Sequence, residues 1–242
     1  MSHSSEKSGA SEGSPQPFLS KARSEWLMRH LAQHRKRRCR IVLTGGPGGG
    51  KTTAADLFRR EIGERVVVVP ESATLLFSGG FPRSQHPQAA FAAQEAIFHV
   101  QRKLEDVQSF LYPDRILLCD RGTVDGAAYF DGTPDKFFKS LETTFEAELA
   151  RYDGVIFFES AAVGGLQIEG GNPIRNESLQ EAVALDERLR KLWMHHPRFI
   201  LVRHDASFFK KIALGLAELD NMVHEYSAAA LKSVRKASKA ST

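Results

Sequence analysis

Short apolar runs alternate along this chain with longer stretches in which apolar positions recur every three or four residues. The apolar runs occupy residues 41–44, 66–69, 116–119, 154–158 and 199–202. The stretches with helical periodicity occupy residues 54–62, 88–110, 133–152, 177–195 and 206–226. Short continuous apolar runs are typical of strands buried on both faces of a parallel sheet, and the helical period is typical of the helices that cover such a sheet. The pattern predicts an α/β fold with a parallel β-sheet of about five strands, flanked by helices on both faces.

A glycine-rich segment directly follows the first apolar run. Residues 45–53 read GGPGGGKTT, which completes a G-x-x-x-x-G-K-T motif between an expected strand and an expected helix. Glycines let backbone N–H groups approach phosphate oxygens, and the new helix directs its unpaired N–H groups at the same anion. We therefore predict a kinase-like P-loop NTPase, in which Lys51 reaches the β- and γ-phosphates and the Thr52 hydroxyl ligates Mg²⁺. The predicted nucleotide-binding residues of this loop are Gly45, Gly46, Pro47, Gly48, Gly49, Gly50, Lys51, Thr52 and Thr53.

Polar residues also follow other predicted strands, at the edge of the sheet where parallel α/β proteins bind ligands. Asp120 ends the third run as a Walker-B carboxylate does, so we predict that it holds Mg²⁺ together with Thr52; a strand-end cap is the alternative. Glu71 follows the second run and is the candidate general base or ligand of a metal-bound water. A helix N-cap or an ordinary loop acid is the alternative for Glu71. Arg121 is a candidate contact for a phosphate or a substrate, with a surface ion pair as the alternative. The last polar strand end is the Arg-His-Asp segment at 203–205.

A second glycine-rich loop covers residues 161–171 and leads into the segment NPIRNE at 172–177. A loop that closes with an arginine over a phosphoryl-transfer site excludes water and neutralises developing charge. Arg175 is therefore a candidate catalytic lid arginine. An ion pair with Glu177 or Glu181 accounts for the same residue equally well.

Charge is distributed unevenly over four predicted segments: a disordered tail at 1–17, a basic amphipathic segment at 18–40, a P-loop nucleotide-binding domain at 41–226 and a basic tail at 227–242. The whole chain has a net charge of +4, but residues 1–40 carry +6 and residues 226–242 carry +4, which leaves −6 for the rest. An acidic core argues against a nucleic-acid partner. The basic ends are candidate contacts for an anionic phospholipid or a protein partner.

Localisation and metal content are constrained by what the sequence lacks. The apolar runs are too short for a transmembrane segment, and the polar N-terminus has no apolar signal region. The two cysteines, Cys39 and Cys119, form neither a disulfide framework nor a metal-binding spacing. The adjacent His195 and His196 fit a helix end better than a metal site. We expect a cytoplasmic protein, with peripheral membrane contact through the basic segments as an option.

Six segments, in this order, make the chain resemble the NadR and translocation-defect-protein family of AAA-type P-loop ATPases and GTPases, and more closely its translocation-defect-protein branch. They are TGGPGGGKTT at 44–53, VVPESATLLFSGG at 68–80, CDRGTVDGAAY at 119–129, NPIRNE at 172–177, ALD at 184–186 and WMHHP at 193–197. The resemblance implies one kinase-like domain that binds ATP or GTP with Mg²⁺, with residues 45–53 on the phosphates, Asp120 near the metal and Arg175 in the lid. It also implies a link to GTP, phosphoinositide and tubulin binding and to membrane-protein trafficking. The chain lacks the N-K-x-D motif by which GTPases read guanine, and the adenylyltransferase domain of NadR.

Two functions are consistent with these features. The first is an Mg²⁺-dependent ATP- or GTP-binding protein that hydrolyses the nucleotide and has a regulatory or trafficking role. The alternative is a small-molecule kinase, of the nucleoside or riboside type, that transfers the γ-phosphate to a hydroxyl. In both, the catalytic candidates are Lys51, Glu71, Asp120 and Arg175.

Overall fold

The computed structural model describes residues 38–165 and 178–240, with side chains to residue 228. Five strands form one sheet in the order β2-β3-β1-β4-β5, and every neighbouring pair is parallel. The strands are β1 (Arg40–Thr44), β2 (Val66–Val69), β3 (Ile116–Asp120), β4 (Gly154–Phe158) and β5 (Phe199–Val202). The predicted α/β fold and all five predicted strands are confirmed. The predicted tail at 1–17, residues 18–37 of the predicted basic segment and Arg175 lie outside the described residues. The last residue of that basic segment, Arg40, belongs to β1.

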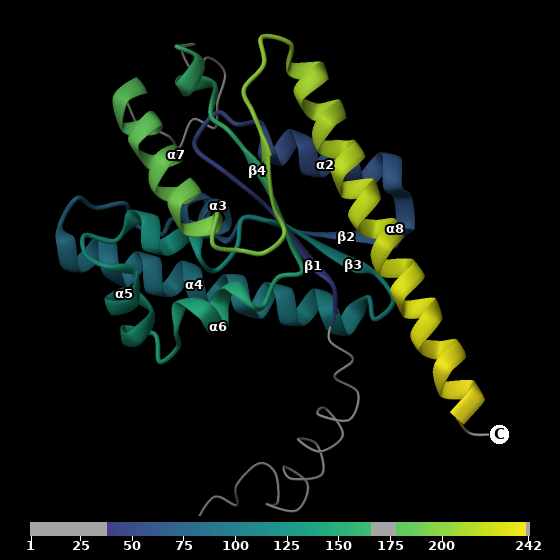
Figure 1. The fold of residues 1–242 in the computed structure, drawn as a ribbon. Coiled ribbons are helices and arrows are strands. Elements are labelled where there is room, and N and C mark those ends of the chain that lie inside the picture. Colours follow the sequence, from purple (N-terminus) through teal and green to yellow (C-terminus); the bar gives the residue numbers. More distant parts are fainter. Residues whose placement is uncertain (1–37, 166–177, 241–242) are drawn as a thin grey trace, which may run out of the picture. The chain divides into compact units, whose positions relative to one another are not determined.

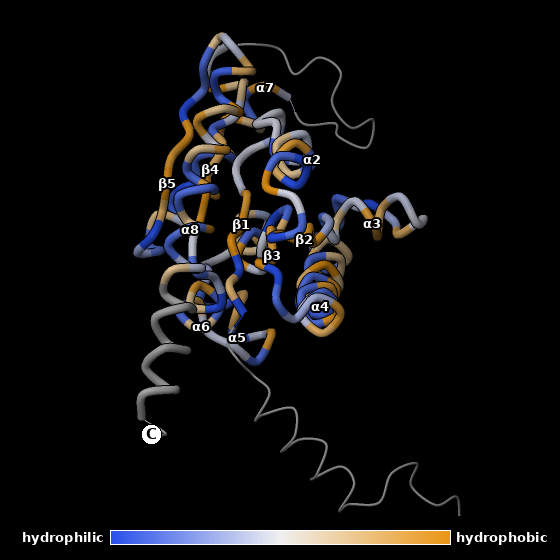
Figure 2. Tube along the Cα trace, turned by 90° about the vertical axis from the view of Figure 1, so that its right-hand side faces the viewer, coloured by the Kyte–Doolittle hydropathy of each residue, from blue (hydrophilic) through white to orange (hydrophobic). Residues whose placement is uncertain are grey.

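Helices cover both faces of the sheet (Figure 1). One face packs against α2 (Lys51–Ile62) and α8 (Phe208–Ala240). The other packs against α4 (Pro87–Leu111), α5 (Pro134–Ser140), α6 (Phe145–Leu149) and α7 (Leu179–Trp193). Alternate strand residues pack on opposite faces of the sheet. Val42 belongs to the core under α4, α5, α6 and α7, whereas Ile41 and Leu43 belong to the core under α2 and α8. Burial on both faces explains why the strands are continuous apolar runs, and Figure 2 shows β4 and β5 largely in orange.

Short elements lie in the connections between the strands and the longer helices. α3 (Ser72–Ser78) follows β2 and packs against α4. Three 3-10 helices, η1 (Gly63–Arg65), η2 (Asp125–Tyr129) and η3 (Ala161–Gly164), lie in the connections after α2, β3 and β4. Among the described helices, none combines the length and the hydrophobicity needed to span a bilayer.

The prediction of one helix over 133–152 is wrong, because the structure has two short helices there, α5 and α6. Glu142 adopts a positive φ of 55°, a conformation that helices do not contain. Thr144 then starts a new helix, since its side chain accepts a hydrogen bond from the Ala147 N–H at 3.1 Å. Helical periodicity continues across this break and conceals the second N-cap.

The closing helix is longer than predicted. α8 continues from Phe208 to Ala240, whereas the sequence pattern predicts an end near Tyr226. Residues 227–240 are rich in alanine and lysine, which have high helix propensity, so no residue there stops the helix.

Candidate nucleotide-binding site

The phosphate-binding loop lies between the end of β1 and the start of α2. Gly45 has a φ of 130°, and a Cβ there would collide with the carbonyl oxygen of Phe158. Gly50 is the N-cap of α2 with a φ of 84°, in the left-handed region that glycine tolerates. The loop thus approaches the β4 backbone more closely than any side chain would allow. The loop leads directly into the N-terminus of α2, a helix of 12 residues, and unpaired N–H groups at a helix N-terminus favour a bound anion.

Lys51, Thr52 and Asp120 converge beside this loop. The Lys51 ammonium donates a hydrogen bond to the Gly46 carbonyl at 2.8 Å, and the Thr52 hydroxyl donates to Asp120 Oδ2 at 2.8 Å. Asp120 Oδ1 is buried and has no hydrogen-bond partner among the described residues. Burial, and after it the nearby Glu71 carboxylate, raises the pKa of Asp120, while Lys51 opposes the shift.

This arrangement fits Mg²⁺. The partnerless oxygen of Asp120 and the Thr52 hydroxyl are oxygen ligands side by side, and Mg²⁺ needs few protein ligands when phosphates and water complete its octahedron. A cation there would also remove the electrostatic penalty on the buried carboxylate. Thr52 and Asp120 are therefore the residues that would hold the metal.

Glu71, Arg121 and Asp125 form a buried ion network at the ends of β2 and β3. Arg121 Nε donates to Glu71 Oε1 at 2.5 Å, and Arg121 Nη1 donates to Asp125 Oδ2 at 2.8 Å. Asp125 also accepts hydrogen bonds from the Thr44 hydroxyl at 2.9 Å and from Trp193 Nε1 at 2.6 Å. Arg121 has a positive φ of 71°, a strained backbone that the surrounding bonds maintain.

These contacts bear on the alternatives that the sequence leaves open for Glu71 and Arg121. Glu71 does occupy the N-cap position of α3, but its side chain makes no capping hydrogen bond and reaches Arg121 instead. Arg121 forms two ion pairs: the one with Asp125 is buried, and the one with Glu71 is partly buried.

A cavity of about 500 Å³ opens beside this network and reaches the phosphate-binding loop at Pro47. Its wall includes Glu71, Arg121 and Asp125. The remaining wall comes from the α3–α4 region and η2, and it mixes polar side chains (Thr74, Gln94, Gln101, Thr123) with apolar ones (Phe77, Ile97, Phe98). Arg83 lies over the Phe77 ring, 4.2 Å from its centroid, at the same cavity. A mostly pre-formed pocket with few convergent polar groups is typical of small-molecule sites.

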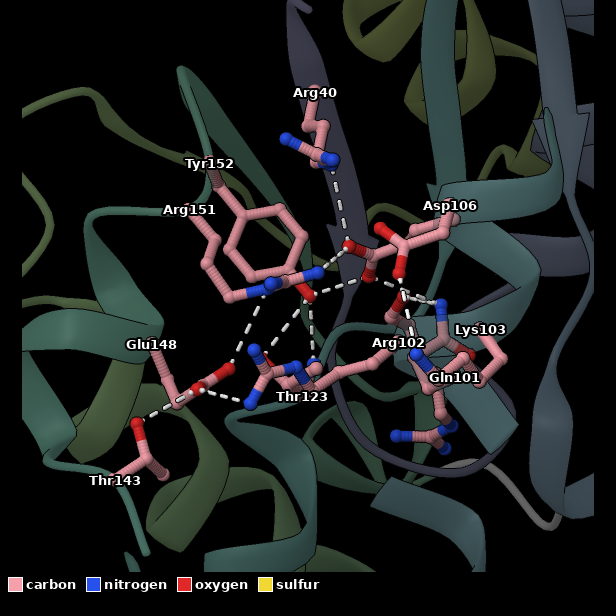
Figure 3. Close-up of polar contacts among 12 residues, drawn as sticks. Arg40, Gln101, Arg102, Lys103, Asp106, Thr123, Thr143, Glu148, Arg151 and Tyr152 are labelled. Atoms are coloured by element: carbon pink, nitrogen blue, oxygen red, sulfur yellow. Dashed lines mark hydrogen bonds and ion pairs between the residues drawn. The ribbon is translucent and has the colours of Figure 1, made fainter. Parts of the chain in front are cut away.

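A second polar network also contacts the turn after β3 (Figure 3). The Tyr152 hydroxyl accepts a hydrogen bond from the Thr123 N–H at 2.7 Å and donates one to Glu105 Oε1 at 2.7 Å. Glu105 Oε2 pairs with Arg151 Nη2 at 2.5 Å and with Arg40 Nε at 3.3 Å. Gln101 Nε2 adds a hydrogen bond to the Arg121 carbonyl at 3.2 Å.

Three residues that the sequence did not indicate as site residues contact the phosphate-binding loop from behind. Asp186 Oδ1 accepts the N–H groups of Gly46 at 2.7 Å and Ser160 at 2.9 Å. The Ser160 hydroxyl donates to the Pro47 carbonyl. Lys211 donates to the Gly49 carbonyl at 2.9 Å.

A sequence signal for two of these residues did exist. Asp186 shares the buried face of α7 with Ala182 and Leu189, and Lys211 precedes Ile212 on the buried face of α8. A charged residue within an apolar helical stripe is rarely buried unless it is paired.

Other candidate residues lie away from the cavity or outside the described residues. Asp205 accepts the Ser207 N–H at 2.9 Å and pairs with Lys210, so it serves the start of α8. His196 follows α7 and bonds the Tyr152 carbonyl at 3.0 Å, as expected of a helix end. The described residues contain no group of three or more His, Cys, Asp or Glu side chains placed to bind a metal.

A family model described as AAA domain matches residues 40–208, which is more than half of the chain. The chain belongs to the AAA domain family. Membership agrees with the observed P-loop and makes this AAA domain a nucleotide-binding protein, usually with Mg²⁺. The family match does not extend to either the NadR or the translocation-defect branch in particular. A comparison with curated proteins found no match.

Proposed function

We propose that this AAA domain is an Mg²⁺-dependent kinase that transfers the γ-phosphate of ATP or GTP to a hydroxyl group of a small molecule. The observation that carries this proposal is the cavity of about 500 Å³ that reaches Pro47 of the phosphate-binding loop and contains the Glu71 carboxylate. A protein that only hydrolyses a nucleotide needs room for one water molecule there. A cavity of this size accommodates a second substrate.

Each residue of the network has a role in such a transfer. Glu71 is the proposed general base: it takes the proton of the acceptor hydroxyl as the oxygen attacks the γ-phosphorus. The bond from that phosphorus to the β,γ-bridging oxygen breaks, and the electron pair leaves with the diphosphate. Arg121 orients the carboxylate through the bond from its Nε, and Asp125 holds the other end of the guanidinium.

The phosphate-binding loop supplies the remaining electrostatics. Lys51 is placed to exchange its bond to the Gly46 carbonyl for bonds to phosphate oxygens. Mg²⁺ held by Thr52 and Asp120 would neutralise charge on the β- and γ-phosphates. The sequence lacks the N-K-x-D motif that reads guanine, so the proposal covers both ATP and GTP as phosphate donors.

Nucleotide hydrolysis with a regulatory or trafficking role is the alternative. It rests on the resemblance to the translocation-defect-protein branch and on the basic ends, with an anionic phospholipid or a protein as the partner. In that function the rate of hydrolysis would respond to a partner surface and not to a small molecule.

Release of ADP and GDP, measured with and without a panel of nucleosides and ribosides, separates these functions. A kinase should release diphosphate at least about tenfold faster with its acceptor, because the hydroxyl replaces water as the nucleophile. Lys51→Ala serves as the blank and should lose phosphate-dependent nucleotide binding while keeping its fold. Release that no acceptor changes, but that anionic vesicles or a partner protein accelerate, would overturn the kinase proposal.

A matched pair of variants tests the role of Glu71. Glu71→Gln should abolish the stimulation by the acceptor, whereas Glu64→Gln, which alters an exposed carboxylate on η1, should leave it unchanged. Equal stimulation in both variants would place the base elsewhere.

A further inference from the structure

Lys211 is a buried cation directly behind the phosphate-binding loop. It lies near the start of α8 and is only 3% exposed. Its ammonium group donates hydrogen bonds to the Gly49 carbonyl at 2.9 Å and to the Glu159 carbonyl at 2.5 Å. The Phe158 ring lies 5.8 Å away. Burying an ammonium is costly, so its presence at this position calls for a role beyond packing.

The bond to the Gly49 carbonyl fixes the orientation of the peptide group between Gly49 and Gly50. In a trans peptide the C=O and the following N–H point in opposite directions. Because the Gly49 carbonyl points back to Lys211, the Gly50 N–H must point away from it, to the open side of the loop. The Ser160 hydroxyl acts on the Pro47 carbonyl in the same way, and so turns the Gly48 N–H outward. The N–H groups of Gly48 and Gly50 are thus both turned outward, while the Gly49 N–H between them donates to the Gly46 carbonyl at 3.4 Å. Backbone N–H groups turned to one side of a loop form an anion-binding concavity.

Lys211 also adds charge to the site. The titratable groups that face it are Asp186 on α7 and Glu159 at the end of β4, and Lys51 on α2 interacts with the same Asp186. Burial lowers the pKa of Lys211 to about 8, and the two carboxylates oppose that shift. The side chain is therefore mainly cationic at pH 7 and loses its charge as the pH rises through about 8.

We propose that Lys211 is a positioning residue of the phosphate site: it anchors the Gly49 carbonyl, directs the Gly50 N–H toward a bound di- or triphosphate, and places a second positive charge behind the loop. This role concerns nucleotide binding and does not depend on whether the enzyme is a kinase.

Two neighbouring lysines on α8 provide a matched test. Lys211→Met removes the ammonium and keeps the length of the side chain. Lys210→Met removes an exposed ammonium that pairs with Asp205. The dissociation constants of Mg·ATP, Mg·GTP and pyrophosphate are measured for each full-length variant at pH 7, and circular dichroism reports the fold. Lys211→Met should bind all three ligands at least about tenfold more weakly, and Lys210→Met within about twofold of the wild type. Equal binding by the two variants would overturn the proposal.

The pH dependence provides a readout that loss of packing would not produce. Between pH 6.5 and 7.5 the affinity of the wild type should be nearly constant, and above about pH 8 it should fall by up to tenfold per pH unit, because the free protein loses a proton that the complex retains. Lys210→Met should show the same fall, and Lys211→Arg, whose guanidinium stays charged, should not. If Lys211→Met does not fold, the wild-type profile still decides, since a flat profile to pH 9.5 would contradict the proposal.

Discussion

Two buried ion networks meet at the turn that follows β3, and they differ in what they face. In the first, Arg121 joins Glu71 and Asp125, and all three line the cavity beside the phosphate-binding loop. In the second, Glu105 joins Arg40 and Arg151, and none of these three lines that cavity. Figure 3 shows Arg40 and Arg151 in this network. The Glu71 side chain retains 12% of its exposure, whereas Glu105 retains none. Ion pairing is common to both networks, so it does not distinguish them. Access to the cavity beside the phosphate-binding loop does, and it is the reason why we propose a catalytic role for the first network alone.

We call the network of Glu71, Arg121 and Asp125 the open network, because it lines the cavity, and that of Glu105, Arg40 and Arg151 the closed network. The closed network supports the open one. The Tyr152 hydroxyl bridges Glu105 and the Thr123 N–H, and Gln101 holds the Arg121 carbonyl. These bonds keep the turn in a conformation that includes the positive φ of Arg121. The comparison predicts that variants of the open network change turnover, and that variants of the closed network change stability.

The largest expected effect is that of Glu71→Gln on turnover. Removing a general base reduces the rate by about 10²- to 10⁴-fold. Arg121 keeps Asp125 as a partner, so the melting temperature should change by only a few degrees. Acceptor-dependent diphosphate release and a thermal melt of the same sample test this. If the variant melts at a much lower temperature but has a normal turnover when folded, Glu71 contributes to stability and not to catalysis.

Glu105→Gln should show the opposite behaviour. It removes the charge of the carboxylate that two arginines near the core share, and among the described residues only Arg151 keeps a second carboxylate, that of Glu148 at 3.4 Å. Breaking a buried pair destabilises a protein by about 3 kcal/mol or more. We expect the low end of that range, because Arg40 and Arg151 each remain 15% exposed. Urea unfolding measures the loss. At a temperature where the variant is folded, its nucleotide affinity should match that of the wild type, and a selective loss of affinity would show that the closed network is part of the site.

Asp125→Asn should affect both properties to a smaller degree. Asp125 accepts bonds from Arg121, from Thr44 and from Trp193, so it belongs to the cavity wall and to the core at once. Loss of its charge should cost about 1–3 kcal/mol of stability and reduce turnover by about tenfold. Trp193→Phe is the control, since it removes one donor at the core and should lower stability alone.

The smallest effect is expected at the rim of the closed network. Arg102 reaches Glu148 at 3.5 Å, but its side chain is 39% exposed to solvent. Ion pairs of this kind contribute less than about 1 kcal/mol. Arg102→Met should therefore leave the urea midpoint nearly unchanged. A loss as large as that of Glu105→Gln would show that the network acts as one unit.

Much of the fold and the phosphate-binding loop could be predicted from the sequence. Continuous apolar runs located all five strands, because a strand buried on both faces has no polar side to interrupt the run. The phosphate-binding loop was predictable because its glycines and Lys51 are consecutive. The break between α5 and α6 was missed, since Thr144 caps a helix within a stretch whose helical period continues.

The remainder of the site depends on contacts between residues far apart in the chain. Glu71 and Arg121 are fifty positions apart, and Asp186 lies 140 positions after Gly46. Sequence spacing indicates that these residues follow strands or lie on helices, and it does not indicate which of them touch.

The sequence by itself determined the chemistry that is local: a strand, a glycine-rich turn and a helix N-terminus that together bind phosphate. Only the tertiary structure decided the arrangement around that loop. The strand order β2-β3-β1-β4-β5 brings Glu71, Arg121 and Asp125 to one cavity and sets Asp186 and Lys211 behind the loop. The physical reason is that local backbone geometry follows from neighbouring residues, whereas the pairing of buried charges follows from how strands and helices pack, and that packing is a property of the whole chain.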